Sequence, residues 1–234
     1  MIKMKTRTKT DWSVRDCWVA SFDILGFKNL VNVDGISFDA QLVQADYEQT
    51  LTHLEQSSEP YSPEDLSYFW LSDTFVIFTN DAQGRSYSLI QQAAKRFITN
   101  CFYSSIPIRG AISVGSLITS DDNRSVMGKA FIDAFVTGED QDWLGLLLTA
   151  QAIAKARSLG LEPSRHDFVA SPTIPMRKCN ANDVMAYRFQ NGSASFRSPL
   201  IPLLESMMQR AGATHEHKYQ RTVDFINAHY RQSQ

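Results

Sequence analysis

The first apolar run of the chain extends from Cys17 to Asp23 and predicts a short buried strand. It leads into a stretch in which Gly26 allows a tight turn. From Phe38 to Glu55, apolar side chains recur at helical spacing and predict an amphipathic helix. Serines and prolines between residues 57 and 63 end this helix.

Two β-rich runs follow, Leu66 to Leu71 and Thr74 to Phe78, and a two-residue polar junction separates them. This arrangement predicts a hairpin. Apolar positions at helical spacing then predict a helix from Tyr87 to Phe102. We expect a further strand from Ile108 to Val114, directly after a proline.

The second half of the chain has a less regular pattern. A short segment from Val126 to Lys129 precedes an apolar-rich stretch, for which we expect helices as far as Ala156. The residues from His166 to Ala170 are consistent with one more strand. Two helices, Pro199 to Met208 and Tyr219 to Tyr230, are expected to form an accessory segment.

The order strand, helix, hairpin, helix, strand is the ferredoxin-like βαββαβ pattern, which places the chain in the α+β class. A length of 234 residues suits one domain with an extension. In this pattern the end of the first strand lies beside the central hairpin. We therefore expect Asp23 and Asp73 to meet in space, although they are far apart in the sequence.

The composition is that of an ordinary globular protein, with 43% hydrophobic and 21% charged residues. A formal net charge of -2 argues against a general nucleic-acid binder, which normally carries a strong basic excess. It is compatible with nucleotide binding, because one triphosphate needs only a local cluster of donors and cations.

Three cysteines, Cys17, Cys101 and Cys179, are widely separated and predict neither a disulfide framework nor a zinc site. The first two lie in apolar surroundings and are expected to be core thiols in a reducing compartment. The basic N-terminus lacks a signal-peptide apolar stretch. The most apolar later segment, Leu144 to Ala154, is far shorter than the ~20 residues that cross a bilayer. We therefore expect a cytoplasmic protein.

The two aspartates form a carboxylate pair suited to Mg²⁺ or Mn²⁺, which prefer hard oxygen ligands. Asp23 lies at a strand end and Asp73 at the hairpin tip, and the backbone carbonyl of Ile24 offers a further oxygen. Such ions promote phosphoryl transfer by activating a hydroxyl group and neutralising phosphate charge. The amides of Gly26 and Phe27, at a turn entering a helix, are candidates for binding phosphates.

Simpler roles remain open for these residues. Asp73 is also a favoured turn residue, and Asp23 is also a favoured helix cap. The Walker pattern GxxxxGK[ST] and the GGDEF signature are both absent from the sequence. The segment His215-Glu216-His217 resembles a metal pair, but its spacing places the histidines on different helix faces, so we expect a solvated segment.

Four segments, in this order, resemble the motifs of class III nucleotidyl cyclases. They are FDILGFKNLV (22–31), LSDTFVIF (71–78), IRGAISVG (108–115) and VMGKAF (126–131). The first two resemble the metal-binding strand and hairpin, the third a following core strand, and the fourth the entry to the late catalytic helix. The DILGFK and RGAIS motifs are most similar to the pyrimidine nucleotide cyclases of bacterial Pycsar antiphage defence.

The four segments span roughly residues 15–160. We expect a catalytic domain over residues 1–180, with residues 181–234 as an accessory helical segment of the same domain. The resemblance implies a homodimer with active sites between the protomers, and two Mn²⁺ or Mg²⁺ ions per site held by Asp23, Ile24 and Asp73. The implied reaction converts UTP or CTP, with UTP favoured, to the 3′,5′-cyclic monophosphate and pyrophosphate. The product would be a second messenger that a separate effector reads in antiphage defence.

The chain departs from the purine-specific relatives at the base-reading position. Four residues before the second metal aspartate they carry Lys or Glu, whereas this chain has Phe69, flanked by Tyr68 and Trp70. An aromatic ring cannot read a purine edge, although it can stack on a base. This disfavours ATP and GTP as substrates, but an adenylate or guanylate cyclase with unusual base recognition remains the alternative.

The family's late-helix Asn and Arg are also missing, because the sequence after Gly128 reads KAFIDAFVTGE, with Val136 near the expected arginine position. The candidates for the cation that stabilises the transition state are Arg109 and Lys129. Arg109 is favoured because a strand fixes its direction, with a surface salt bridge as its alternative role. The same absence leaves open a nucleotide-binding sensor that has lost turnover.

Overall fold

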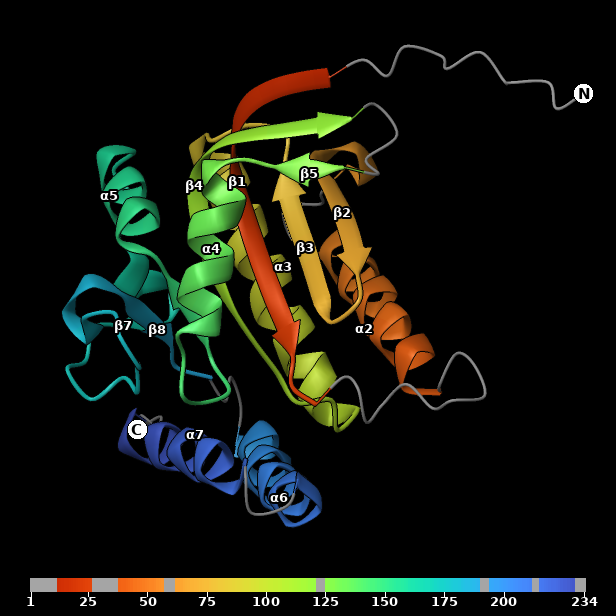
Figure 1. Cartoon of the computed structure of the whole chain (residues 1–234), viewed down its shortest axis with the longest axis vertical. Coiled ribbons are helices and arrows are strands. Elements are labelled where there is room, and N and C mark those ends of the chain that lie inside the picture. The colour runs from red at the N-terminus through yellow and green to blue at the C-terminus, as the bar shows by residue number, and fades with distance from the viewer. Residues whose placement is uncertain are drawn as a thin grey trace, which may run out of the picture.

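The computed structural model describes residues 12–26, 38–56, 62–120, 125–189, 194–211 and 215–229. Within these ranges the chain forms one mixed sheet of eight strands with helices on both faces (Figure 1). Seven strands follow the order β2-β3-β1-β4-β6-β8-β7, and β5 (Val126–Met127) pairs with β4.

Four antiparallel strands at one side of this sheet carry the predicted βαββαβ order. β1 (Trp12–Ile24) lies between β3 (Thr74–Thr79) and β4 (Ile108–Ser120), and β2 (Leu66–Leu71) pairs with β3. The α+β class and the hairpin are therefore confirmed. β1 and β4 have 13 residues each and are longer than the sequence pattern indicates.

Side chains of β1 alternate between the two faces of the sheet, because successive residues of a strand point in opposite directions. Trp18, Ala20 and Phe22 belong to the main core, which also contains residues of two helices. These helices, α2 (Phe38–Glu55) and α3 (Gly84–Tyr103), confirm the two predicted before and after the hairpin. They cover one face of the sheet.

The opposite face carries a smaller apolar cluster that includes Cys17, Val19 and Ala130. Ala130 belongs to α4 (Lys129–Glu139), which packs across β1 and β4 on this side (Figure 1). Asp23 continues the alternation of Cys17 and Val19. Its side chain therefore lies on the α4 face.

The region after α4 corrects one prediction. We expect helices as far as Ala156, but the strand β6 (Leu146–Leu148) precedes the helix α5 (Ala150–Ser158). The three leucines are 0% exposed and pair in parallel with β4. A short apolar run of this kind is ambiguous between a buried strand and a buried helix, so the sequence pattern alone cannot separate them.

The C-terminal part of the chain completes the sheet and adds two helices. β7 (Phe168–Val169) confirms the predicted late strand, whereas β8 (Met185–Tyr187) has no counterpart in the prediction. The expected helices are present as α6 (Ala194–Ala211) and α7 (Glu216–His229). Both lie near the edge of the sheet at which β1 ends (Figure 1).

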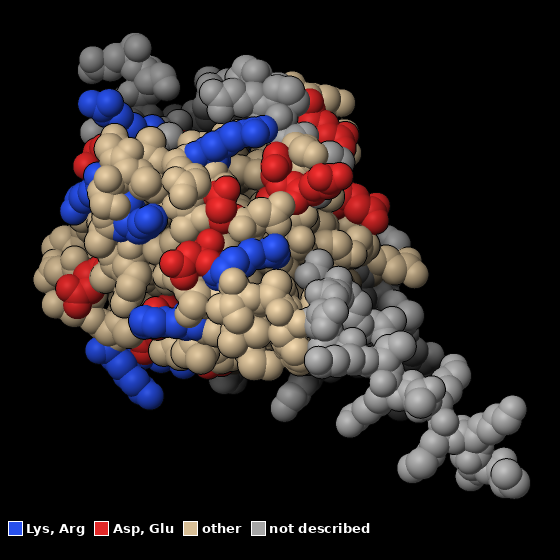
Figure 2. Space-filling model, turned by 90° about the horizontal axis from the view of Figure 1, so that it is seen from above, with Lys and Arg blue, Asp and Glu red and all other residues tan. Residues whose placement is uncertain are grey.

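The thiols and the surface charges agree with the composition. Cys17 and Cys101 are buried, which confirms them as core thiols, and Cys179 is exposed. On the face that Figure 2 shows, basic side chains lie among acidic and uncharged ones without forming a continuous basic stripe. Among the described helices, none combines the length and the apolar character needed to cross a membrane.

Candidate active site

Two aspartates from different strands meet at one edge of the sheet. Asp23 is the penultimate residue of β1, and Asp73 lies in the two-residue turn that joins β2 to β3. The amide of Ile24 donates a hydrogen bond of 2.9 Å to the carbonyl oxygen of Asp73. The indole Nε1 of Trp70 donates to the carbonyl oxygen of Ser72 at 2.8 Å and stabilises the same turn. The structure thus brings together the pair that the sequence places 50 positions apart.

Arg109 lies directly opposite Asp23 in the pairing of β1 with β4. Its Nε and Nη2 atoms donate to Oδ2 of Asp23 at 2.8 and 2.7 Å. Its Nη1 atom donates to the backbone carbonyl oxygens of Glu139 at 2.9 Å and Gln141 at 2.6 Å. Only 6% of Arg109 is exposed, so the salt bridge expected as its alternative role is present but is buried, not at the surface. The guanidinium orients the Asp23 carboxylate and joins the sheet to the end of α4.

The two carboxylates retain oxygen atoms that can bind a metal ion. Arg109 contacts only Oδ2 of Asp23, and no described residue hydrogen bonds to the Asp73 carboxylate. In the described part of the chain, no group of three or more His, Cys, Asp or Glu side chains is arranged to enclose a metal ion. Mg²⁺ is usually held by one or two carboxylates, with water and substrate phosphates as the other ligands. The pair therefore fits an ion shared with a phosphate substrate.

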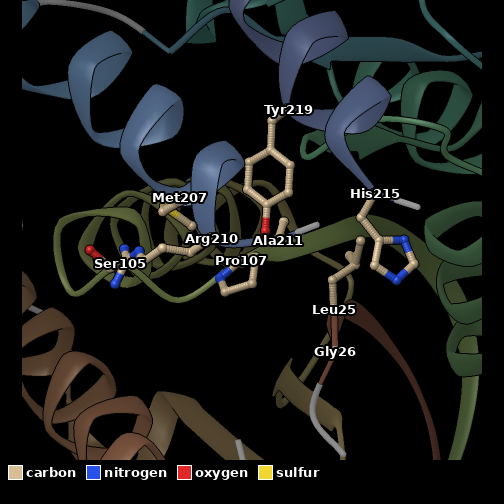
Figure 3. A pocket seen from close by; sticks show the side chains of 9 residues that line it. All are labelled: Leu25, Gly26, Ser105, Pro107, Met207, Arg210, Ala211, His215 and Tyr219. Atoms are coloured by element: carbon tan, nitrogen blue, oxygen red, sulfur yellow. The ribbon is translucent and has the colours of Figure 1, made fainter. Parts of the chain in front are cut away.

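A cavity of about 190 Å³ lies where β1 ends, between the following turn and the C-terminal helices (Figure 3). It is lined by Leu25, Gly26, Ser105, Pro107, Met207, Arg210, Ala211, His215 and Tyr219. Gly26 adopts a φ of 71°, a left-handed conformation that favours glycine, which confirms the predicted turn. Phe27, the other predicted phosphate-binding residue, lies outside the described residues.

Two basic side chains at the start of α7 lie close to this site, and the sequence analysis assigns neither to it. His215 lines the cavity, and Lys218 is only 7% exposed. The pKa of Lys218 is lowered to about 8, chiefly by burial and also by Arg109 and Arg177, while Asp23 acts in the opposite direction. Burial, with a contribution from Lys218, lowers the pKa of His215. Both groups therefore lie within electrostatic range of the Asp23–Arg109 pair.

Among the three aromatic residues of β2, only Phe69 lies on the α4 face together with Asp23. Tyr68 and Trp70 point to the other face, where both rings contact Phe75. Phe69 is half-buried and packs against the smaller apolar cluster. Of the three candidates for base stacking, Phe69 alone is on the side of the sheet that carries the aspartate.

Lys129 lies at the opposite end of α4 from the contacts of Arg109. Ten residues separate it from Glu139, which corresponds to about 15 Å along a helix. Its Nζ forms an ion pair of 2.7 Å with Asp133, and its side chain is 63% exposed. Within one chain, the structure does not bring Lys129 to the aspartates.

No protein-family model matches this chain, and no curated protein matches it. The solved structures to which it is similar include adenylyl and guanylyl cyclases. One is the catalytic core of a rhodopsin-guanylyl cyclase with converted specificity, in complex with ATPαS. Its sequence is 10% identical, the match covers 63% of this chain and 84% of that chain, and the TM-score is 0.48. Another is a double mutant of the guanylyl cyclase domain of the RhoGC fusion protein from Blastocladiella emersonii. It is 13% identical, the match covers 70% of this chain and 91% of that chain, and the TM-score is 0.48. A third is the adenylate/guanylate cyclase/hydrolase from Silicibacter pomeroyi. It is 13% identical, the match covers 75% of this chain and 96% of that chain, and the TM-score is 0.42.

Proposed function

We propose that the protein is a metal-dependent nucleotidyl cyclase. The observation that carries this proposal is the meeting of Asp23 and Asp73 at one edge of the sheet, with Arg109 holding the first carboxylate. The turn at Gly26 and the adjoining cavity supply space for a phosphate chain beside them. The proposed reaction converts a nucleoside triphosphate to its 3′,5′-cyclic monophosphate and pyrophosphate.

Asp23 and Asp73, with the carbonyl of Ile24, would hold Mn²⁺ or Mg²⁺, two ions per site. When bound, such ions acidify the ribose 3′-hydroxyl and neutralise charge on the phosphates. The 3′-oxygen forms a bond to the α-phosphorus, the bond from the α-phosphorus to the bridging oxygen breaks, and pyrophosphate leaves. The hydroxyl proton passes to solvent. The protein contributes position and charge, because phosphoryl transfer needs little covalent help.

For the base we propose a pyrimidine, with UTP ahead of CTP. Phe69 supports this choice, because the residue on the Asp23 side of β2 is apolar and offers no hydrogen bond to a purine edge. An adenylate or guanylate cyclase with different base recognition is the alternative. We further propose that the product acts as a second messenger in antiphage defence and is read by a separate effector.

The proposed cyclase is a homodimer with active sites between its protomers. The α4 face supports this arrangement, because large apolar side chains are exposed on it: Met127 is 48%, Ile132 56% and Val136 52% exposed. Ile132 and Val136 are four residues apart on α4 and so lie on one side of the helix. A second copy packed on this face would bury them. In this arrangement Lys129 of one protomer would contribute its charge to the active site of the other protomer.

A nucleotide-binding protein without turnover is the second candidate. The observation that favours it is the double contact of Arg109 with Oδ2 of Asp23, since the guanidinium competes with a metal ion for that carboxylate. Retention of Asp73 with no described partner favours the enzyme instead.

The proposal is tested by incubating the purified protein with ATP, GTP, CTP and UTP separately in the presence of Mn²⁺, followed by mass spectrometry. We expect cyclic UMP or cyclic CMP, and no product from the Asp73→Ala variant. Cyclic AMP or GMP would retain the metal site but contradict the base assignment. Binding without any product would leave the sensor as the function.

A further inference from the structure

Lys218 is a buried cation without a partner in the described part of the chain. It is 7% exposed, and no ion pair or hydrogen bond of its Nζ occurs with the described residues. A buried ammonium group is unfavourable unless another group compensates its charge. The acidic group that acts on it electrostatically, Asp23, already shares Oδ2 with Arg109. Lys218 therefore has no carboxylate of its own among the described residues.

Three other cations around α7 share one acidic partner, which Lys218 does not contact. Asp142, in the loop after α4, contacts Arg177 at 3.7 Å and His217 at 3.2 Å. The same carboxylate also forms an ion pair with Arg221. These cations lie on the outer side of α7, where 45–46% of each side chain is exposed. Lys218 points to the inner side and does not share this acid.

The position of Lys218 is fixed by contacts on the same helix. Thr222, one turn further on, accepts a hydrogen bond of 2.8 Å from the amide of Leu144. The rings of Trp143 and Phe225 lie 4.4 Å apart between their centroids. These contacts join α7 to the loop after α4, in which the carbonyl of Gln141 accepts a hydrogen bond from Arg109. Lys218 therefore stands on an element anchored to the site.

The cavity at the end of β1, which is lined by Tyr219, the residue next to Lys218 in the sequence, has a basic side and contains the turn proposed to bind phosphates. His215 and Arg210 both line it; in Figure 3 the His215 ring lies on the side of Leu25 and Gly26, whereas the Arg210 side chain extends toward Ser105. The Nδ1 atom of His215 is buried without a described partner. A phosphate chain that follows the turn at Gly26 would meet His215 first.

We propose that α7 completes the triphosphate site, with Nζ of Lys218 binding the β- or γ-phosphate of the substrate and His215 assisting it. This inference rests on the proposed nucleotidyl cyclase function and assigns one substrate-binding residue to it. The positive charge expected from an arginine on α4, where this chain has Val136, is then supplied by Lys218 on α7. The C-terminal segment acquires a role in substrate binding as well as in packing.

The test measures binding rather than turnover. Calorimetry on the full chain with Mn²⁺ would compare α,β-methylene-UTP, which cannot release pyrophosphate, with UMP. For Lys218→Met we expect a loss of about tenfold or more in affinity for the triphosphate analogue and less than a twofold change for UMP. The melting temperature should be unchanged or higher, because methionine retains the apolar stem and removes a buried charge. Lys155→Met, on α5, is the matched control and should bind both ligands normally.

The possible results separate the two proposals. Normal affinity of Lys218→Met for the triphosphate analogue would overturn the inference while the cyclase proposal stands. Equal losses for UMP and the analogue, with a lower melting temperature, would show a structural role and also overturn it. If the wild type binds none of the α,β-methylene analogues of UTP, CTP, ATP and GTP, the proposed function itself fails. Lys218→Arg, which keeps the charge, should retain most of the affinity that methionine loses.

Discussion

At the scale of single residues, Asp23 and Asp73 have different surroundings although they are proposed to hold the same ions. Asp23 is joined to a buried arginine by two short contacts, whereas no described residue binds the Asp73 carboxylate. We therefore expect one carboxylate to contribute to both stability and the proposed chemistry, and the other to the proposed chemistry alone. Substitutions at the two positions should separate these contributions.

We expect Asp73→Asn to reduce turnover at least 100-fold with little change in the free energy of unfolding. Asp23→Asn should reduce turnover as strongly and also destabilise the protein by about 1–3 kcal/mol, because a buried guanidinium loses its charged partner. Product analysis and urea denaturation measure the two effects. Asp183→Asn, at an exposed position, is the control for charge. Equal stability of both variants would contradict the structural role of the Asp23–Arg109 pair.

The three thiols should differ sharply in reactivity. Burial raises the pKa of Cys17 to about 12 and raises that of Cys101 well above its ordinary value. At pH 8 both remain protonated, and only the thiolate is nucleophilic. We expect iodoacetamide to modify Cys179 alone in the native protein, as read by mass spectrometry of peptides. Burial also raises the pKa of Cys179, so its labelling should become faster as the pH rises above 8. Rapid labelling of Cys17 before unfolding would contradict this assignment.

Sequence reasoning at this scale succeeds where order along the chain determines position. The βαββαβ order brings the end of the first strand to the hairpin, so the meeting of the aspartates is predictable. The pairing of Arg109 with Asp23 is not predictable, because the two residues are 86 positions apart and meet only through the register of β1 with β4. Lys218 gives no sequence signal, since one lysine on an amphipathic helix has the pattern of a solvated residue.

At the scale of elements, the sheet depends on a close approach between β1 and β4. A Cβ atom on Gly110 would lie 2.5 Å from the Phe22 ring and 2.6 Å from the Ser21 carbonyl oxygen. Gly110→Ala should therefore destabilise the protein by about 1–3 kcal/mol, the usual cost of overpacking. Gly84→Ala, where the nearest atom is 3.5 Å away, is the matched control and should change stability little. Thermal unfolding of both variants measures the difference; equal melting temperatures would contradict the close packing.

The elements that the sequence predicts are those with a local pattern. The helix over Phe38–Glu55 has its apolar stripe within one segment, and the hairpin is marked by its polar junction. β6 and β8 have three residues each, too few for a period to show. Leu147 of β6 pairs with Ala111 on one side and Ala186 on the other. Such a strand forms because it pairs with segments that are distant in the sequence. Local residue propensities carry no information about these partners.

At the scale of the whole molecule, the exposed apolar residues of α4 separate a dimer from a monomer. We expect the double variant Ile132→Glu, Val136→Glu to be monomeric by light scattering and to lose at least tenfold in turnover. Both side chains are more than half exposed, so its melting temperature as a monomer should be unaffected by lost core packing. Ala154→Glu, at an exposed position of α5, is the control. An active monomeric wild type would contradict the shared-site arrangement.

The alternation of side chains along β1 has a consequence for how this gene can change. Between Trp18 and Asp23, each residue faces either the core or the α4 side. All 13 residues of β1 pair with β4, so an added or lost residue would shift the register of the strand. Insertion or loss of a single codon there would turn the carboxylate of Asp23 into the aromatic core and direct Phe22 toward the proposed metal site. Substitutions can be tolerated along this strand one at a time. A change of its length by one residue removes the site and the core together, so the strand is expected to keep its length even where its residues vary.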